Sequence, residues 1–222
     1  MKKIIHLFLG LFIIQSLAAQ VGFSVSTDLS VLRNFTKDQE FTSFGQTVHA
    51  NWHLKEKETV YVWISYFVNG KYSNRLTAVA KDSATSPQAI NYTSNSNLRY
   101  RTLSIGWKHY FKGTFHREDP GLSIYSIAGL GLLSGLVENG YNPGIDTALY
   151  TVPQKAISGT EGFKRLTIDL GVGLETELFP SVYLYGELRT WVPITDYPSP
   201  YLFNNDVPKV ATAGLGLRVL FY

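Results

Sequence analysis

Apolar and polar residues alternate along most of the chain after residue 20. Successive side chains of a β-strand point to opposite faces, so alternation with a period of two predicts strands. Eight segments carry this pattern or, in the case of 121–136, an uncharged apolar run: 21–31, 47–54, 60–68, 102–111, 121–136, 163–178, 181–193 and 211–221. We therefore predict an all-β chain with eight strands.

Glycine alternates with large aliphatic residues in three of these segments. Ala-Gly-Leu-Gly-Leu occurs at 128–132 and again at 213–217, and Leu-Gly-Val-Gly-Leu lies at 170–174. Such a strand has one apolar face and one face without side-chain bulk. This pattern predicts a small closed barrel.

The connections between the predicted strands alternate in length. Those at 55–59, 112–120 and 179–181 are short or charged, whereas those at 34–43, 71–97, 137–162 and 195–208 are generally longer and polar. Short turns at one end and long loops at the other are typical of bacterial outer-membrane barrels, in which the short turns are periplasmic. We predict an eight-stranded, antiparallel, up-and-down transmembrane β-barrel.

The first residues have the pattern of an export signal. Met1-Lys2-Lys3 precedes an apolar run over 4–14, and Ala18 and Ala19 both offer acceptable cleavage positions. We predict a signal peptide over 1–19 and one barrel domain over 20–222. No later apolar run is long enough for a transmembrane helix.

Composition excludes several functions. The 222-residue chain contains no cysteine, which excludes thiolate catalysis, thiolate metal sites and lipid attachment at an N-terminal cysteine. Its formal charge of +3 falls to +1 when Lys2 and Lys3 are removed with the signal peptide, so charge gives no reason to expect nucleic-acid binding. No cofactor is predicted.

Charged residues share the polar faces of the predicted strands. These are Asp28, Lys108, Asp169, Glu175, Glu177, Glu187, Arg189 and Arg218. In lipid, Arg or Lys at the bilayer midplane costs about 2–4 kcal/mol, so this face must point inward. Pairing around the 179–181 turn would place Gly173 opposite Glu187 and Gly171 opposite Arg189, so that the glycines leave space for these two long charged side chains. Asp169 would then lie diagonally to Arg189, within reach of a salt bridge.

A soluble barrel would have the opposite polarity, with its apolar face inside. Aromatic residues near the predicted periplasmic strand ends instead favour a membrane, because they match an interfacial girdle. They are Phe23, Trp52, Trp107, Phe111, Phe179 and Phe221.

With its signal peptide, alternating strands, Gly-x-Gly segments and the ending Val219-Leu220-Phe221-Tyr222, the mature chain resembles small eight-stranded outer-membrane proteins of the OmpA, OmpX and OmpW type. It is most similar to the outer-membrane β-barrel domain proteins common in Bacteroidetes. The resemblance implies that Phe221 and Tyr222 form the signal read by the barrel-assembly machinery. It also implies a monomer in contact with outer-membrane lipid and lipopolysaccharide, whose loops bind an extracellular ligand or protein.

Other motifs give little support for catalysis. Gly129-Leu130-Gly131 lacks the spacing and helix of a nucleotide loop. His49 and His53 share an interior face but lie roughly 13 Å apart along a strand, too far for one ion. His116 is in a predicted periplasmic turn, and no His-x-Ser-Asn cluster of a lipid A-modifying barrel is present. The predicted role is structural or surface interaction through extracellular loops, with the interior plugged by charged residues. A narrow porin-like conduit and a lipid-modifying enzyme remain alternatives.

Overall fold

The computed structural model describes residues 22–116, 121–153 and 155–221. Within them the chain forms nine strands: β1 Gly22–Asn34, β2 Phe41–Lys55, β3 Glu58–Ala80, β4 Ala89–Lys112, β5 Leu122–Asn142, β6 Tyr150–Thr151, β7 Gly159–Phe179, β8 Val182–Pro193 and β9 Val210–Phe221. Among these residues no helix has the length and apolar character needed to cross a membrane.

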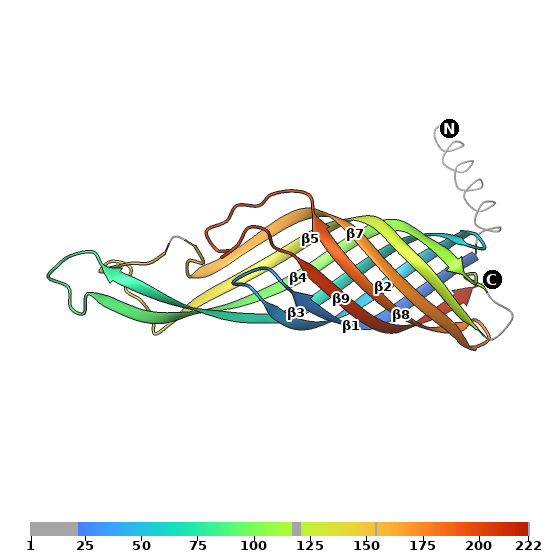
Figure 1. Cartoon of the computed structure of the whole chain (residues 1–222), viewed down its shortest axis with the longest axis horizontal. Coiled ribbons are helices and arrows are strands. Elements are labelled where there is room, and N and C mark those ends of the chain that lie inside the picture. The colour runs from blue at the N-terminus through green and yellow to red at the C-terminus, as the bar shows by residue number, and fades with distance from the viewer. Residues whose placement is uncertain (1–21, 117–120, 154, 222) are drawn as a thin grey trace, which may run out of the picture.

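Eight of the strands close into a ring (Figure 1). Each pairs antiparallel with its neighbours in the order β2-β1-β9-β8-β7-β5-β4-β3, and pairing of β2 with β3 completes the circle. The two-residue β6 lies outside the ring, against residues 79 and 80 of β3. The predicted eight-stranded antiparallel barrel is confirmed.

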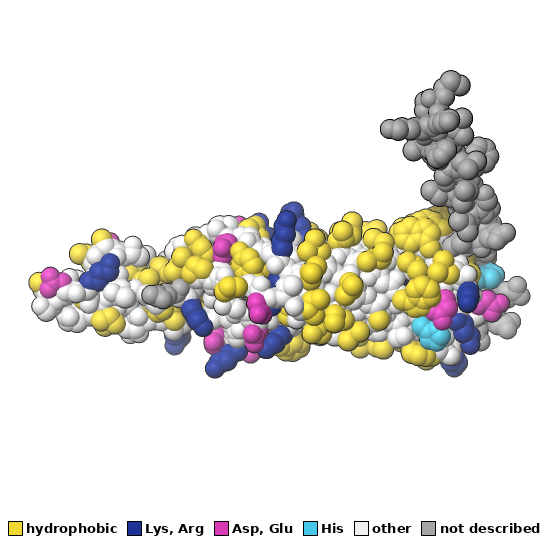
Figure 2. Space-filling model, turned by 90° about the horizontal axis from the view of Figure 1, so that it is seen from above, with side chains coloured by type: hydrophobic (Ala, Val, Ile, Leu, Met, Phe, Trp, Pro, Cys, Tyr) yellow, Lys and Arg dark blue, Asp and Glu magenta, His cyan; other side chains and the backbone are white. Residues whose placement is uncertain are grey.

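The alternating side chains of each strand point to the outside and to the inside of the barrel. Outward-pointing Leu29, Leu130 and Val172 are 76%, 60% and 53% exposed, whereas inward-pointing Asp28 and Asp169 are each 2% exposed. Apolar side chains form a belt around the barrel, and charged side chains gather beyond both of its edges (Figure 2). The apolar interior expected of a soluble barrel is therefore wrong for this chain.

The two ends of the barrel differ as predicted. The connections from Lys55 to Glu58, Lys112 to Leu122 and Phe179 to Val182 lie at one end, where the start of β1 also pairs with the end of β9. The connections from Asn34 to Phe41, Ala80 to Ala89, Asn142 to Gly159 and Pro193 to Val210 lie at the other end, and the last two of these are the longest in the chain. We call these the short-turn end and the long-loop end.

The prediction of a loop over 71–97 is wrong. Residues 70–79 of β3 pair with residues 89–98 of β4, so this segment is a long hairpin that projects beyond the ring (Figure 1). Its Ser, Thr and Asn residues hide the strand pattern, but Tyr72, Ala78 and Tyr92 point to one buried face. The polar composition of this segment indicated a loop, but its few apolar residues alternate and the segment forms two paired strands.

The barrel interior contains aromatic side chains in addition to charges. Inside the long-loop half, Trp63, Phe67, Tyr100 and Trp191 belong to one apolar cluster, and each is 1% exposed or less. A separate small cluster of Ala78, Tyr92 and Tyr150 lies in the projecting hairpin and joins it to β6.

Candidate functional site in the barrel interior

The turn between β7 and β8 sets the register of the charged residues. Gly173 lies opposite Glu187 and Gly171 opposite Arg189, as predicted from the sequence. The turn itself is tighter than expected, because Phe179 pairs directly with Val182, and a register shift between Glu177 and Phe179 compensates.

Gly173 makes room for a different side chain from the one predicted. We expected the glycine to leave room for Glu187, but a Cβ atom at position 173 would lie 2.3 Å from Cε2 of the Tyr125 ring. The ring occupies this space and its hydroxyl donates to Glu187 Oε1 at 2.7 Å. The glycine therefore admits the aromatic ring that positions the carboxylate.

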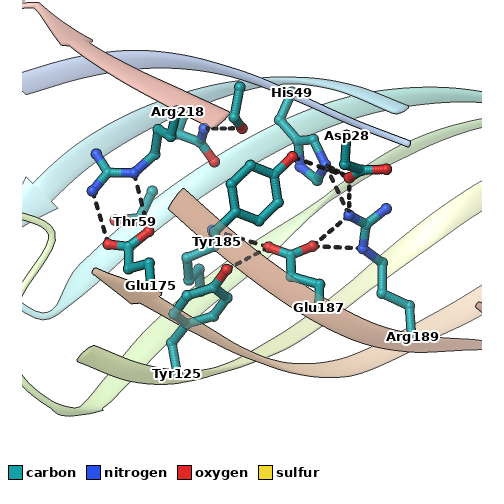
Figure 3. Close-up of polar contacts among 12 residues, drawn as sticks. Asp28, His49, Thr59, Tyr125, Glu175, Tyr185, Glu187, Arg189 and Arg218 are labelled. Atoms are coloured by element: carbon teal, nitrogen blue, oxygen red, sulfur yellow. Dashed lines mark hydrogen bonds and ion pairs between the residues drawn. The ribbon is translucent and has the colours of Figure 1, made fainter. Parts of the chain in front are cut away.

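Arg189 is the centre of the network (Figure 3). Its Nη2 lies 2.6 Å from Asp28 Oδ2 on β1, and its Nε donates to Glu187 Oε2 at 2.5 Å. Nη2 also donates to His49 Nε2 at 3.0 Å. The same His49 nitrogen lies 3.4 Å from Asp28 Oδ2, so the imidazole contacts both the guanidinium and its carboxylate partner. One arginine thus joins β8 to β1 and β2 across the lumen.

Two further groups extend this network. Lys108 Nζ lies 3.3 Å from Glu187 Oε1 and 4.0 Å from the centre of the Tyr125 ring. Tyr185 donates to Asp28 Oδ2 at 3.0 Å, so each carboxylate accepts from a cation and a tyrosine. Buried carboxylates with several charge-assisted hydrogen bonds hold their partners in one arrangement.

A second cluster lies nearer the short-turn end. Arg218 donates to both oxygens of Glu175, at 2.8 and 3.1 Å, and Tyr110 donates to Glu175 Oε1 at 2.9 Å. Arg218 also donates to the carbonyl of Phe115, whose ring stacks on His53 at 4.1 Å between ring centres. The connection after β4 therefore folds against the interior.

Two of the predicted charged residues lie outside these clusters. Asp169 is opposite Trp191 and accepts a hydrogen bond from Thr167 at 2.7 Å, so the predicted salt bridge with Arg189 is wrong. The arginine instead reaches across the lumen to Asp28, which sequence pairing of β7 with β8 did not consider. Glu177 is half-buried beside the register shift at the turn, and no described residue forms an ion pair with it.

Sequence reasoning missed the tyrosines of the network. Tyr110, Tyr125 and Tyr185 all supply hydroxyl donors to buried carboxylates. Tyr110 lies two positions after Lys108, and Tyr185 lies two positions before Glu187. Each of these tyrosines therefore shares the polar face of its strand with that charged residue. A tyrosine beside a charge on an inward face is the signal that could have found them.

The cluster has the spacing of a metal site but not its chemistry. Asp28, His49 and Glu187 each place one ligand atom within 4.8 Å of the other two. Arg189 contacts all three of these side chains, and its guanidinium supplies the positive charge between the carboxylates. A divalent cation would have to displace this buried arginine.

The predicted assembly signal is described in part. Phe221 is half exposed at the end of β9 and stacks on Phe23, with 6.0 Å between ring centres. Tyr222 and the predicted signal peptide over 1–19 lie outside the described residues.

No protein-family model matches the chain, and no curated protein matches it by sequence. Solved structures match the chain by fold. Neisserial surface protein A is 13% identical with a TM-score of 0.53, and the match covers 90% of this chain and 97% of that one. A major outer membrane protein from Thermus thermophilus is also 13% identical with a TM-score of 0.53, over 90% and 99% of the two chains. The chain has the fold of the small outer-membrane β-barrels.

Proposed function

We propose that the chain is an integral outer-membrane barrel of a Gram-negative bacterium that acts through its extracellular surface. The apolar belt lies in lipid, the short-turn end faces the periplasm and the long-loop end faces outward. It is exported by its signal peptide, and the end of β9 is recognised by the barrel-assembly machinery. Because its ring closes within one chain, the barrel needs no second copy to complete its sheet, which supports the proposal that it acts as a monomer.

The observation that carries this proposal is the projecting β3–β4 hairpin. It extends the sheet beyond the ring and has its own apolar cluster around Tyr92 and Tyr150, so its shape is fixed by packing. The hairpin tip is also tied to the connection before β6, because Lys81 Nζ donates to the carbonyl of Thr147 at 2.7 Å. A long, ordered and polar projection provides a surface for an extracellular ligand or protein.

The filled lumen favours interaction over transport. An eight-stranded ring leaves an interior that side chains can fill. Here Trp63, Trp191 and Arg218 are each 1% exposed and share that interior with the buried ion pairs. A conduit for small solutes would require these groups to move apart. Lipid-modifying catalysis is not the function that we propose, because among the described residues the buried carboxylates of Asp28, Glu175 and Glu187 are held in ion pairs and Asp169 Oδ1 accepts a hydrogen bond from Thr167.

Two measurements test this proposal. First, the refolded protein should insert into phospholipid vesicles and migrate differently on gels before and after heating. Second, planar bilayers containing it should show no steady single-channel conductance, with an open porin as the positive control. Steady conductance would support the conduit instead. Recovery as a soluble protein without heat-modifiable migration would contradict the membrane assignment, and altered lipid A in a deletion strain would point to an enzyme.

A further inference from the structure

Outward-facing residues of β3, β4, β5 and β7 form rows across the barrel wall, because the four strands are in register. The last apolar row towards the long-loop end consists of Ile64, Leu103, Leu132 and Leu166, which lie opposite one another in sequence along the sheet. Their side chains are between 44% and 59% exposed. In the proposed membrane orientation this row contacts acyl chains.

The next outward row changes from apolar to basic. It consists of Tyr66, Arg101, Ser134 and Lys164, two residues and about 7 Å further along each strand. The Arg101 guanidinium lies 5.1 Å from the centre of the Tyr66 ring, and no carboxylate of the described residues is within ion-pair distance of it. An aromatic platform thus holds an arginine whose charge is not neutralised.

Arg101 and Arg99 line the same notch. The notch has a volume of about 220 Å³, and its wall includes Tyr66, Ser134 and Gly162. Arg99 pairs with Glu138, with Nη2 at 2.9 and 3.0 Å from the carboxylate oxygens. Arg101 therefore supplies the unpaired positive charge of the notch, and the N–H groups of Arg99 that Glu138 leaves unused and the Ser134 hydroxyl add further donors that a phosphate group requires.

A polar groove lies directly beyond this notch. It has a volume of about 520 Å³ and includes Lys71, Asn95, Asn97 and Glu138 in its lining. Asn97 Oδ1 is buried without a hydrogen-bond partner among the described residues. Gly140 borders open space in this groove, because a Cβ atom there would meet nothing within 4 Å. Amides, an ammonium group and a carboxylate are suited to the many hydroxyls of a sugar.

We propose that this outer stripe of β3, β4, β5 and β7 binds a phosphorylated glycolipid of the outer leaflet. Acyl chains lie on the Leu103 row, a phosphate enters the notch between Arg99 and Arg101, and the sugar lies in the groove at Asn97. The order of chemistry along the strands matches the order of groups along such a lipid. A free sugar phosphate has no acyl chains that could contact the apolar row. This inference rests on the proposed membrane orientation.

The test is a binding titration of the refolded protein in detergent micelles. Its four probes are core-bearing lipopolysaccharide, bisphosphorylated lipid A, dephosphorylated lipid A and inorganic phosphate. We expect affinity to fall in that order, with no measurable binding of inorganic phosphate. Arg101→Gln should weaken binding of bisphosphorylated lipid A about tenfold or more, because a charge-assisted contact is lost. Asn97→Ala should weaken binding of the core-bearing form only.

Arg33→Gln is the matched control, because Arg33 is also an exposed arginine near the long-loop end and pairs with Glu40 at 2.9 Å. It should bind the lipids like the parent protein. Equal affinity for phosphorylated and dephosphorylated lipid A, or equal losses in Arg33→Gln and Arg101→Gln, would overturn the inference. Vesicle insertion is measured separately. A protein that inserts but does not select phosphorylated lipid refutes this inference alone, whereas a protein that fails to insert refutes the proposed function.

Discussion

Removal of the Arg189 guanidinium should destabilise the barrel by an amount that follows from its burial and its partners. The side chain is 4% exposed and forms ion pairs with Asp28 and Glu187. Replacement by methionine keeps much of the volume but leaves buried carboxylates without their cation. Breaking a buried pair in this way costs about 3–5 kcal/mol.

The destabilisation by Arg189→Met should arise mainly from the unpaired charge of Asp28. Glu187 keeps Lys108 at 3.3 Å, whereas Arg189 is the only lysine or arginine that the described residues bring within ion-pair distance of Asp28. Arg189→Met should therefore be partly rescued by Asp28→Asn, which removes the unpaired charge. We expect the two substitutions to be coupled by about 1–3 kcal/mol in a double-mutant cycle.

The assay is urea-dependent unfolding in phospholipid vesicles, followed by heat-modifiable gel migration and by tryptophan fluorescence. Fluorescence is informative because the Arg189 guanidinium lies 5.2 Å from the centre of the Trp63 ring. Arg33→Met provides the control, since an exposed ion pair contributes at most about 1 kcal/mol. Additivity of Arg189→Met and Asp28→Asn within about 0.5 kcal/mol would refute the reasoning.

Three other predictions follow from the same structure. Gly173→Ala should cost about 1–3 kcal/mol by overpacking against Tyr125, whereas Gly186→Ala, whose Cβ would meet nothing closer than 3.8 Å, should be nearly neutral in the same unfolding assay. Val172→Arg should cost about 2–4 kcal/mol in lipid, and tolerance of this charge would contradict an outward-facing position 172. Replacement of residues 76–92 by a two-residue turn joins the cross-strand partners Arg75 and Thr93. It should leave barrel stability unchanged, because the hairpin cluster is separate from the interior cluster. A stability loss comparable to that of Val172→Arg would show that the two are coupled.

The ring could be predicted because its evidence is local. Alternation along single segments identified eight strands, and the short connection near Pro180 gave the register of Gly171 and Gly173 against β8. The length of β3 and β4 could not be predicted in the same way. Their outer halves are rich in polar residues, and only pairing between the two strands makes the pattern recognisable.

The site was predicted in composition but not in connectivity. Sequence parity placed Asp28, Glu187 and Arg189 on inward faces, where the structure has them. It could not say that Arg189 reaches β1 rather than its diagonal neighbour Asp169, because that choice depends on distances across the closed lumen. Contacts between non-adjacent strands leave no trace in a single sequence.

The central claim is that the apolar face contacts lipid and the charged face is enclosed. The native chain contains no cysteine, so one introduced at position 172 can be labelled alone. We predict that a fluorophore at Val172→Cys is quenched by lipids brominated on their acyl chains, and that the thiol resists a water-soluble maleimide in vesicles. Rapid maleimide labelling together with absence of quenching would contradict the claim.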